Sequence, residues 1–95
     1  MKQKEKIKQS PEINDILDQD ISEKRFLILF NDDYNTFDFV IETLIEVCKH
    51  DVYQAEQCAF IVHNKGKCDV KRGSLSQLKP LKDELINRGL TASIN

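Results

Sequence analysis

Three polar residues in a row, Asn31, Asp32 and Asp33, stand between a run of strand length and a run with helical spacing. A histidine, His63, ends the helical run that follows. Together these side chains offer amide, carboxylate and imidazole acceptors, which suit a positively charged ligand. Each also has an ordinary structural explanation. Asn and Asp are frequent in turns and caps, and a histidine at a helix C-terminus complements the helix dipole. The residues therefore predict a site only if the fold brings them together.

The first half of the chain predicts one strand and two helices. Residues 25–30 form a nearly continuous apolar run of strand length. Residues 37–48 place apolar side chains at the spacing of one helical face, and residues 52–63 predict a second helix. Because the link between the helices is short, they should form an antiparallel hairpin, with His50 at the surface of the link. The start of the first helix then lies beside the end of the second.

The second half predicts a strand, a helix and a closing strand. Residues 68–70 favour a short strand, and Ser74 begins the pattern of a capping box. Residues 75–86 have helical spacing, in which Pro80 marks either the true start of the helix or a kink. Residues 90–94 alternate as a strand. The expected fold is α+β, a small three-stranded antiparallel sheet packed against three helices in the order β-α-α-β-α-β.

Length and composition limit the domain organisation of the chain. With 95 residues the chain has room for one small domain, which we place at residues 24–95. Residues 1–23 alternate lysines with polar residues and then turn acidic. They have little apolar surface to bury, so we expect a flexible N-terminal arm.

Several classes of function are disfavoured. The formal net charge is −2, and the absence of a long basic stripe argues against nucleic acid as a partner. No apolar run approaches the roughly 20 residues that span a bilayer. Three cysteines without a CxxC pair or clustered histidines predict neither disulfides nor a metal site. We expect reduced thiols, a cytoplasmic protein and no cofactor.

The helical hairpin makes three segments converge. Ala59, Val62 and His63 share one face of the second helix, and Phe37 and Val40 occupy the first turn of the first. The expected site is an apolar wall with a polar rim: Phe37, Val40, Ala59 and Val62 in the wall, and Asn31, Asp32 and His63 at the rim. Such a site suits an ammonium group attached to an apolar side chain, as in a peptide's N-terminal residue. The apolar residues could equally be ordinary core.

A catalytic alternative stays open from the residues alone. Asp32 and His63 could act as an acid–base pair, but no residue supplies a nucleophile or an oxyanion hole.

The amino-acid sequence between Phe26 and Lys67 resembles that of the ClpS family of adaptors. The similarity lies in LFNDDYNTFDFVIETLIEV followed by AEQCAFIVHNKGK. The family's small, non-enzymatic proteins recognise N-terminal residues and deliver substrates to ATP-driven Clp proteases. The resemblance implies that Asn31, Asp32 and His63 hold the substrate's α-amino group. It also implies a pocket for the first side chain, lined by Phe37, Val40, Ala59 and Val62, with Asn35 near the entrance and Leu90 at the far wall.

Three positions depart from the family pattern. Asn35 stands where Thr is usual, and Phe37 and Ala59 stand where Met is usual. The two Met positions affect the size and selectivity of the pocket.

The resemblance also implies the partners. The expected protein is a monomeric adaptor that binds substrates with a bulky hydrophobic N-terminal residue. It docks on the N-terminal domain of a ClpA- or ClpC-like AAA+ unfoldase, with the arm engaging that enzyme. The alternative is a modulator that docks on the Clp ATPase without reading N-termini.

Overall fold

The computed structural model describes residues 24–95, so the predicted arm, residues 1–23, lies outside the described residues. The elements follow the expected order: β2 (Arg25–Phe30), α2 (Phe37–Cys48), α3 (Val52–Lys65), β3 (Lys67–Gly73), α4 (Leu75–Asn87) and β4 (Thr91–Ile94). The predicted α+β fold of three helices and a three-stranded sheet is confirmed.

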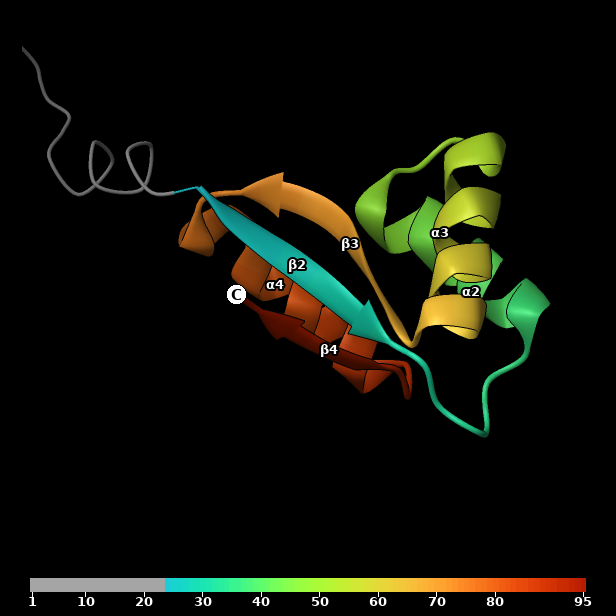
Figure 1. Cartoon of the computed structure of the whole chain (residues 1–95). Helices are drawn as coiled ribbons and strands as arrows, with labels where there is room; N and C mark the ends of the chain where they lie inside the picture. The colour runs from blue at the N-terminus through green and yellow to red at the C-terminus, as the bar shows by residue number, and fades with distance from the viewer. Residues whose placement is uncertain (1–23) are drawn as a thin grey trace, which may run out of the picture.

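The sheet has the order β3-β2-β4, with β2 paired antiparallel to both neighbours. α4 lies across one face of the sheet, whereas α2 and α3 pack together beside β3 (Figure 1). Leu27 and Leu29 of β2 are completely buried and join Leu44 of α2 and Leu85 of α4 in one hydrophobic core. This core holds the helical hairpin in place against the sheet.

The helix boundaries follow from their caps. The side chain of Thr36 accepts a hydrogen bond from the N–H of Phe39 and so caps the start of α2. Asp51 begins α3 in the same way. Gly66, with φ of 93°, ends α3 two residues later than predicted, because a glycine reaches the left-handed region without strain.

α4 begins with the predicted capping box. The Ser74 hydroxyl accepts from the N–H of Gln77, and the Gln77 side chain accepts from the N–H of Ser74. Pro80 lies inside α4, so it does not mark the start of the helix. β3 is longer than predicted because residues 67–73 pair along the whole of β2, with an irregularity between Leu27 and Ile28.

The middle residue of the link between α2 and α3 packs against β3, so the prediction that His50 is a surface residue is wrong. His50 is only 4% exposed, and its Nε2 lies 2.6 Å from the carbonyl oxygen of Val70. Since a carbonyl only accepts, Nε2 carries the proton. The Nζ of Lys71 donates to the carbonyl of Cys48 at 3.0 Å. These two bonds fasten the helical hairpin to β3.

Candidate functional site

The loop between β2 and α2 is organised around the carboxylate of Asp32. Its Oδ1 accepts from the backbone N–H groups of Tyr34 and Asn35, both at 2.8 Å. Its Oδ2 accepts from the side-chain amide of Asn35 at 2.8 Å. Partial burial favours a higher pKa for Asp32, but the hydrogen bonds from Asn35 and Tyr34 outweigh it and lower the pKa below its ordinary value. Asp32 is therefore a turn-forming residue that stays ionised.

The loop is tied to two distant segments. The backbone N–H of Asn31 donates to the carbonyl of Gly66 at 2.9 Å, which places the loop beside the end of α3. The side-chain amide of Asn35 donates to the carbonyl of Gly89 at 3.0 Å, next to Leu90. The loop, the end of α3 that carries His63, and the turn before β4 thus converge.

The expected apolar wall is largely continuous with the core. Ala59, Val62 and Leu90 are 2%, 3% and 4% exposed, and Val40 packs against the core cluster. Phe37 is different because it is 43% exposed at the start of α2. Phe37 shares a helical face with the buried Leu44, but it stands in the first turn of α2, where its side chain stays partly exposed.

Three polar side chains at this end of the molecule have no partner within residues 24–95. Asn31, Asp33 and His63 are exposed, and their side chains make no hydrogen bond or ion pair with the described part of the chain. Asp33 was not predicted as a site residue. An Asp in a turn often bonds the backbone two residues further on, as Asp32 does with Tyr34, whereas the neighbouring carboxylate of Asp33 is exposed.

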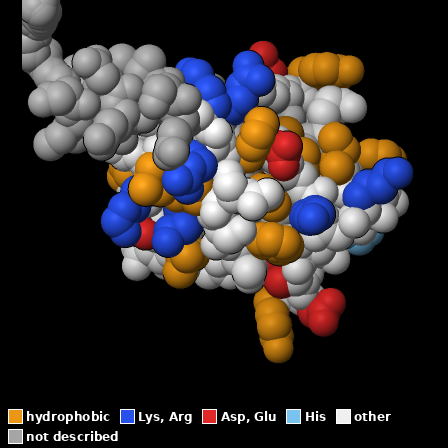
Figure 2. Space-filling model, turned by 60° about the vertical axis from the view of Figure 1, so that its left-hand side comes forward, with side chains coloured by type: hydrophobic (Ala, Val, Ile, Leu, Met, Phe, Trp, Pro, Cys, Tyr) orange, Lys and Arg blue, Asp and Glu red, His pale blue; other side chains and the backbone are white. Residues whose placement is uncertain are grey.

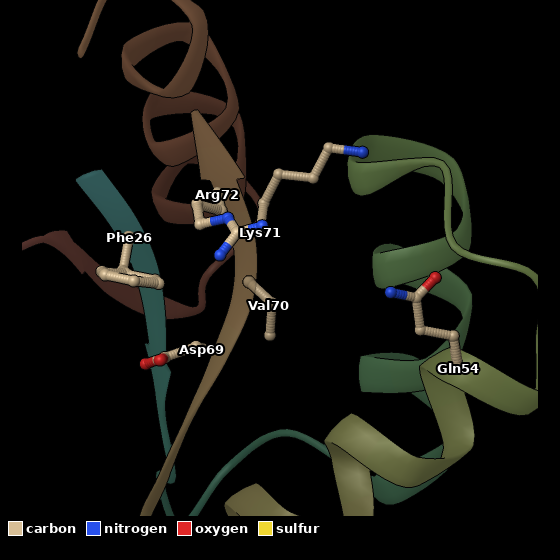
Figure 3. A pocket seen from close by; sticks show the side chains of 6 residues that line it. All are labelled: Phe26, Gln54, Asp69, Val70, Lys71 and Arg72. Atoms are coloured by element: carbon tan, nitrogen blue, oxygen red, sulfur yellow. The ribbon is translucent and has the colours of Figure 1, made fainter. Parts of the chain in front are cut away.

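A hollow in the described region lies elsewhere. Its volume is about 250 Å³, and Figure 3 shows the residues that line it: Phe26, Gln54, Asp69, Val70, Lys71 and Arg72. None of these residues belongs to the predicted site. The Lys71 side chain extends from β3 toward the end of α2, in keeping with its bond to Cys48.

The thiols behave as small buried hydrophobes. Cys48 and Cys58 are buried, and Cys68 is half-buried. Burial raises the pKa of Cys48 to about 11, and burial together with the neighbouring Cys58 thiol raises that of Cys68 to about 12. Protonated thiols are poor nucleophiles. Within residues 24–95 no group of three His, Cys, Asp or Glu side chains is arranged to hold a metal ion.

A catalytic pair is not assembled in the described region either. Asp32 makes its hydrogen bonds with Tyr34 and Asn35 and none with His63. The geometry offers binding groups for a cation beside apolar side chains.

The comparison with protein families matches residues 22–93 to the model described as "ATP-dependent Clp protease adaptor protein ClpS". The chain belongs to the ClpS family. The predicted family is therefore confirmed.

Two curated relatives illustrate the similarity. The ClpS adapter protein of Salmonella gallinarum is 40% identical over 55 residues, which cover 56% of this chain and 52% of that protein. The ClpS adapter protein of Nitratidesulfovibrio vulgaris is 32% identical over 68 residues, which cover 67% of this chain and 68% of that protein. The match thus spans about half the length of the first relative and two thirds of the second.

A solved structure shares the fold. Agrobacterium tumefaciens ClpS2 bound to L-phenylalaninamide matches 76% of this ClpS-family chain and 94% of its own chain, with a TM-score of 0.65 and 20% identity. Among the described residues, no helix combines the length and apolar character needed to cross a membrane.

Proposed function

We propose that this protein binds the N-terminal residue of substrate proteins, prefers a bulky hydrophobic one, and delivers those proteins to a Clp ATPase–protease. The observation that supports this most directly is the convergence of three segments. The Asn31–Asn35 loop is bonded to Gly66 at the end of α3 and to Gly89 before β4. Unpartnered polar side chains then lie beside buried apolar ones. The ligand of the Agrobacterium protein, L-phenylalaninamide, likewise has a free α-amino group beside an apolar side chain.

In this proposal Asn31, Asp32 and His63 hold the α-ammonium group. An ammonium group has three donors and needs acceptors in different directions. Asp32 already accepts three bonds, so one acceptor direction remains, on Oδ2. The exposed carboxylate of Asp33 is the other nearby source of negative charge. The first side chain of the substrate would contact Phe37, Val40, Ala59, Val62 and Leu90, with Asn35 at the entrance.

The magnitudes suit a transient adaptor. Hydrogen bonds to a charged group contribute about 1.5–3 kcal/mol each, and burying an apolar side chain contributes about 1.5–3 kcal/mol. Three such bonds and one side chain, less the cost of ordering the peptide, predict roughly micromolar to submicromolar binding.

The decisive experiment uses peptides that differ only at the N-terminus. A peptide that begins with Leu, Phe or Tyr should bind, and its N-acetylated form should not, because acetylation removes the charge and two donors. Fluorescence anisotropy with labelled peptides measures both. Equal affinities for the free and acetylated peptides would refute amine recognition. They would instead support the alternative, a modulator that docks on the ATPase without reading N-termini.

Isosteric variants distinguish the roles of the Asp32 and Asp33 carboxylates in binding. Asp32→Asn and Asp33→Asn each remove one negative charge and preserve the shape of the side chain. Replacing the carboxylate that contacts the ammonium group should lower the affinity for the peptide roughly 10- to 150-fold. If only Asp33→Asn weakens binding, the role of Asp32 is confined to shaping the loop.

Delivery of substrates to a protease requires a partner protein. The proposed partner is the N-terminal domain of a ClpA- or ClpC-like unfoldase, with the protein acting as a monomer in the cytoplasm and without enzymatic activity. In keeping with the family resemblance, residues 1–23 would engage the unfoldase.

A further inference from the structure

We propose that Asn35 is a positioning residue that sets the distance between the ammonium-binding loop and the far wall of the pocket; this inference rests on the proposed function. Asn35 is half-buried at the point where the loop meets α2. The sequence predicts it only as a residue near the entrance of the pocket.

Asn35 holds both oxygens of the Asp32 carboxylate. Its backbone N–H donates to Oδ1 at 2.8 Å, and its side-chain amide donates to Oδ2 at 2.8 Å. The terminal torsion of an aspartate is broad when nothing restrains it. Two donors from one neighbouring residue restrict that rotation, so Asn35 fixes the direction in which the remaining acceptor site of Oδ2 points.

The same side chain reaches across to the turn before β4. Nδ2 of Asn35 also donates to the carbonyl of Gly89 at 3.0 Å. That turn is itself restrained, because the N–H of Gly89 donates to Ile86 at 2.9 Å and the N–H of Leu90 donates to Leu85 at 3.0 Å. Leu90 is only 4% exposed. Asn35 therefore connects the polar rim to a fixed apolar residue at the opposite side of the pocket.

Both hydrogens of the Asn35 amide are used by these two bonds, one to Asp32 and one to Gly89. Asn35 has no side-chain N–H left for a bound peptide. The effect of these two donors on binding then acts through Asp32 and the Gly89 turn. Few side chains can replace it, because threonine has a single hydroxyl donor, and alanine and ionised aspartate have none.

A double-mutant cycle tests whether Asn35 acts through Asp32. Affinity for a free-amine Leu peptide is measured for the wild type, Asn35→Ala, Asp32→Ala and the double variant. We expect Asn35→Ala to weaken binding about 2- to 12-fold, the equivalent of one ordinary hydrogen bond. In the Asp32→Ala background its effect should be clearly smaller, because only the bond to Gly89 remains to be lost and coupled residues are not additive. An equal loss in both backgrounds would overturn the proposal.

Asn64→Ala is the matched control. Asn64 also donates its side-chain amide to a backbone carbonyl, that of Phe60 at 2.8 Å, but within its own helix. The control should keep the wild-type affinity. Asn35→Thr keeps one donor and should fall between the wild type and Asn35→Ala, which also provides a milder variant if the alanine protein does not fold.

Amide hydrogen exchange gives a readout that needs no peptide. The N–H of Tyr34 donates to Oδ1 of Asp32, so it should exchange about 2- to 12-fold faster in Asn35→Ala or Asn35→Thr and at the wild-type rate in Asn64→Ala. Unchanged exchange in both Asn35 variants would overturn the positioning role. If exchange accelerates but the wild-type protein binds no free-amine peptide, the proposed function fails and the positioning of Asp32 by Asn35 stands.

Discussion

His50 and His63, the two histidines of the chain, stand in opposite surroundings. The imidazole of His50 is buried, and its Nε2 donates to the carbonyl of Val70. His63 is exposed near the end of α3 and makes no hydrogen bond or ion pair with the described residues. A buried, bonded ring contributes mainly to stability, whereas an exposed, unpartnered ring is available to a ligand.

Replacing each histidine by alanine should therefore give opposite results. His50→Ala should lower the free energy of unfolding by about 2–4 kcal/mol, because it leaves a cavity and an unpaired buried carbonyl. His63→Ala should change it by less than about 0.5 kcal/mol but weaken peptide binding. Urea unfolding and fluorescence anisotropy measure the two quantities. A His50→Ala protein as stable as the wild type would contradict the structural role of this ring.

The lowered pKa of Asp32 predicts how stability depends on pH. A carboxylate with a folded-state pKa below its unfolded value of about 3.9 stabilises the fold above that value. The contribution is lost as pH falls further, through the lower folded-state pKa. Asp32→Asn should then be less stable than the wild type at pH 7, and the difference should shrink below about pH 4. Urea midpoints at pH 7, 4 and 3 test this, with Asp33→Asn as the control. A pH-independent difference would show that the charge of Asp32 is not involved.

At the scale of elements, the hairpin of α2 and α3 is held at both of its ends. The bond from His50 to Val70 and that from Lys71 to Cys48 fasten the link to β3. The bond from Asn31 to Gly66 fastens the opposite end, where the candidate site lies. Because each helix is capped by its own residues, the lengths of the helices are set locally and their positions by these ties.

The start of α4 offers a test of a single cap. Gly73 does not have a positive φ, but a Cβ there would lie 2.6 Å from Oε1 of Gln77. That oxygen accepts from the N–H of Ser74 at 3.0 Å. Gly73→Ala should therefore displace Gln77 and lower stability by about 1 kcal/mol. The measurement is urea unfolding.

The control for this prediction is the Gln77→Ala background. There the obstructing side chain is absent, and Gly73→Ala should be neutral or slightly stabilising, since it reduces the freedom of the unfolded chain. A cost that persists in this background would mean that the backbone at Gly73, and not the cap, limits the substitution.

At the scale of the whole molecule, one core joins all the described elements. The buried cluster includes Leu27 of β2, Val47 of α2, Val62 of α3, Val70 of β3 and Leu78 of α4. Figure 2 shows Lys and Arg side chains distributed among apolar and acidic ones on one face of this body. The candidate site forms where β2 ends and three segments of the body meet, so its geometry depends on the complete domain.

Deleting residues 1–23 should accordingly leave the domain folded, because every residue of the described core lies after residue 24. Affinity for a free-amine Leu peptide should be unchanged. Delivery to the protease should be slowed or abolished, if the arm engages the unfoldase as proposed. Thermal melts, anisotropy and a degradation assay measure the three properties. Loss of the folded state in the melts would show that residues 1–23 belong to the domain.

The sequence by itself determined the order and type of the six elements, because strand and helix periodicity and the caps at Asp51 and Ser74 are local properties. It also determined the family, through the residues around Asn31 and His63. Only the tertiary structure decided that His50 is buried, since its ring contacts Val70 of β3, and that Phe37 is partly exposed. The tertiary structure also decided the hydrogen bonds of the Asn35 side-chain amide. It donates to the carboxylate of Asp32 and to the carbonyl of Gly89, which lies 54 residues further along the chain. Contacts at such separations depend on packing, which no local pattern contains.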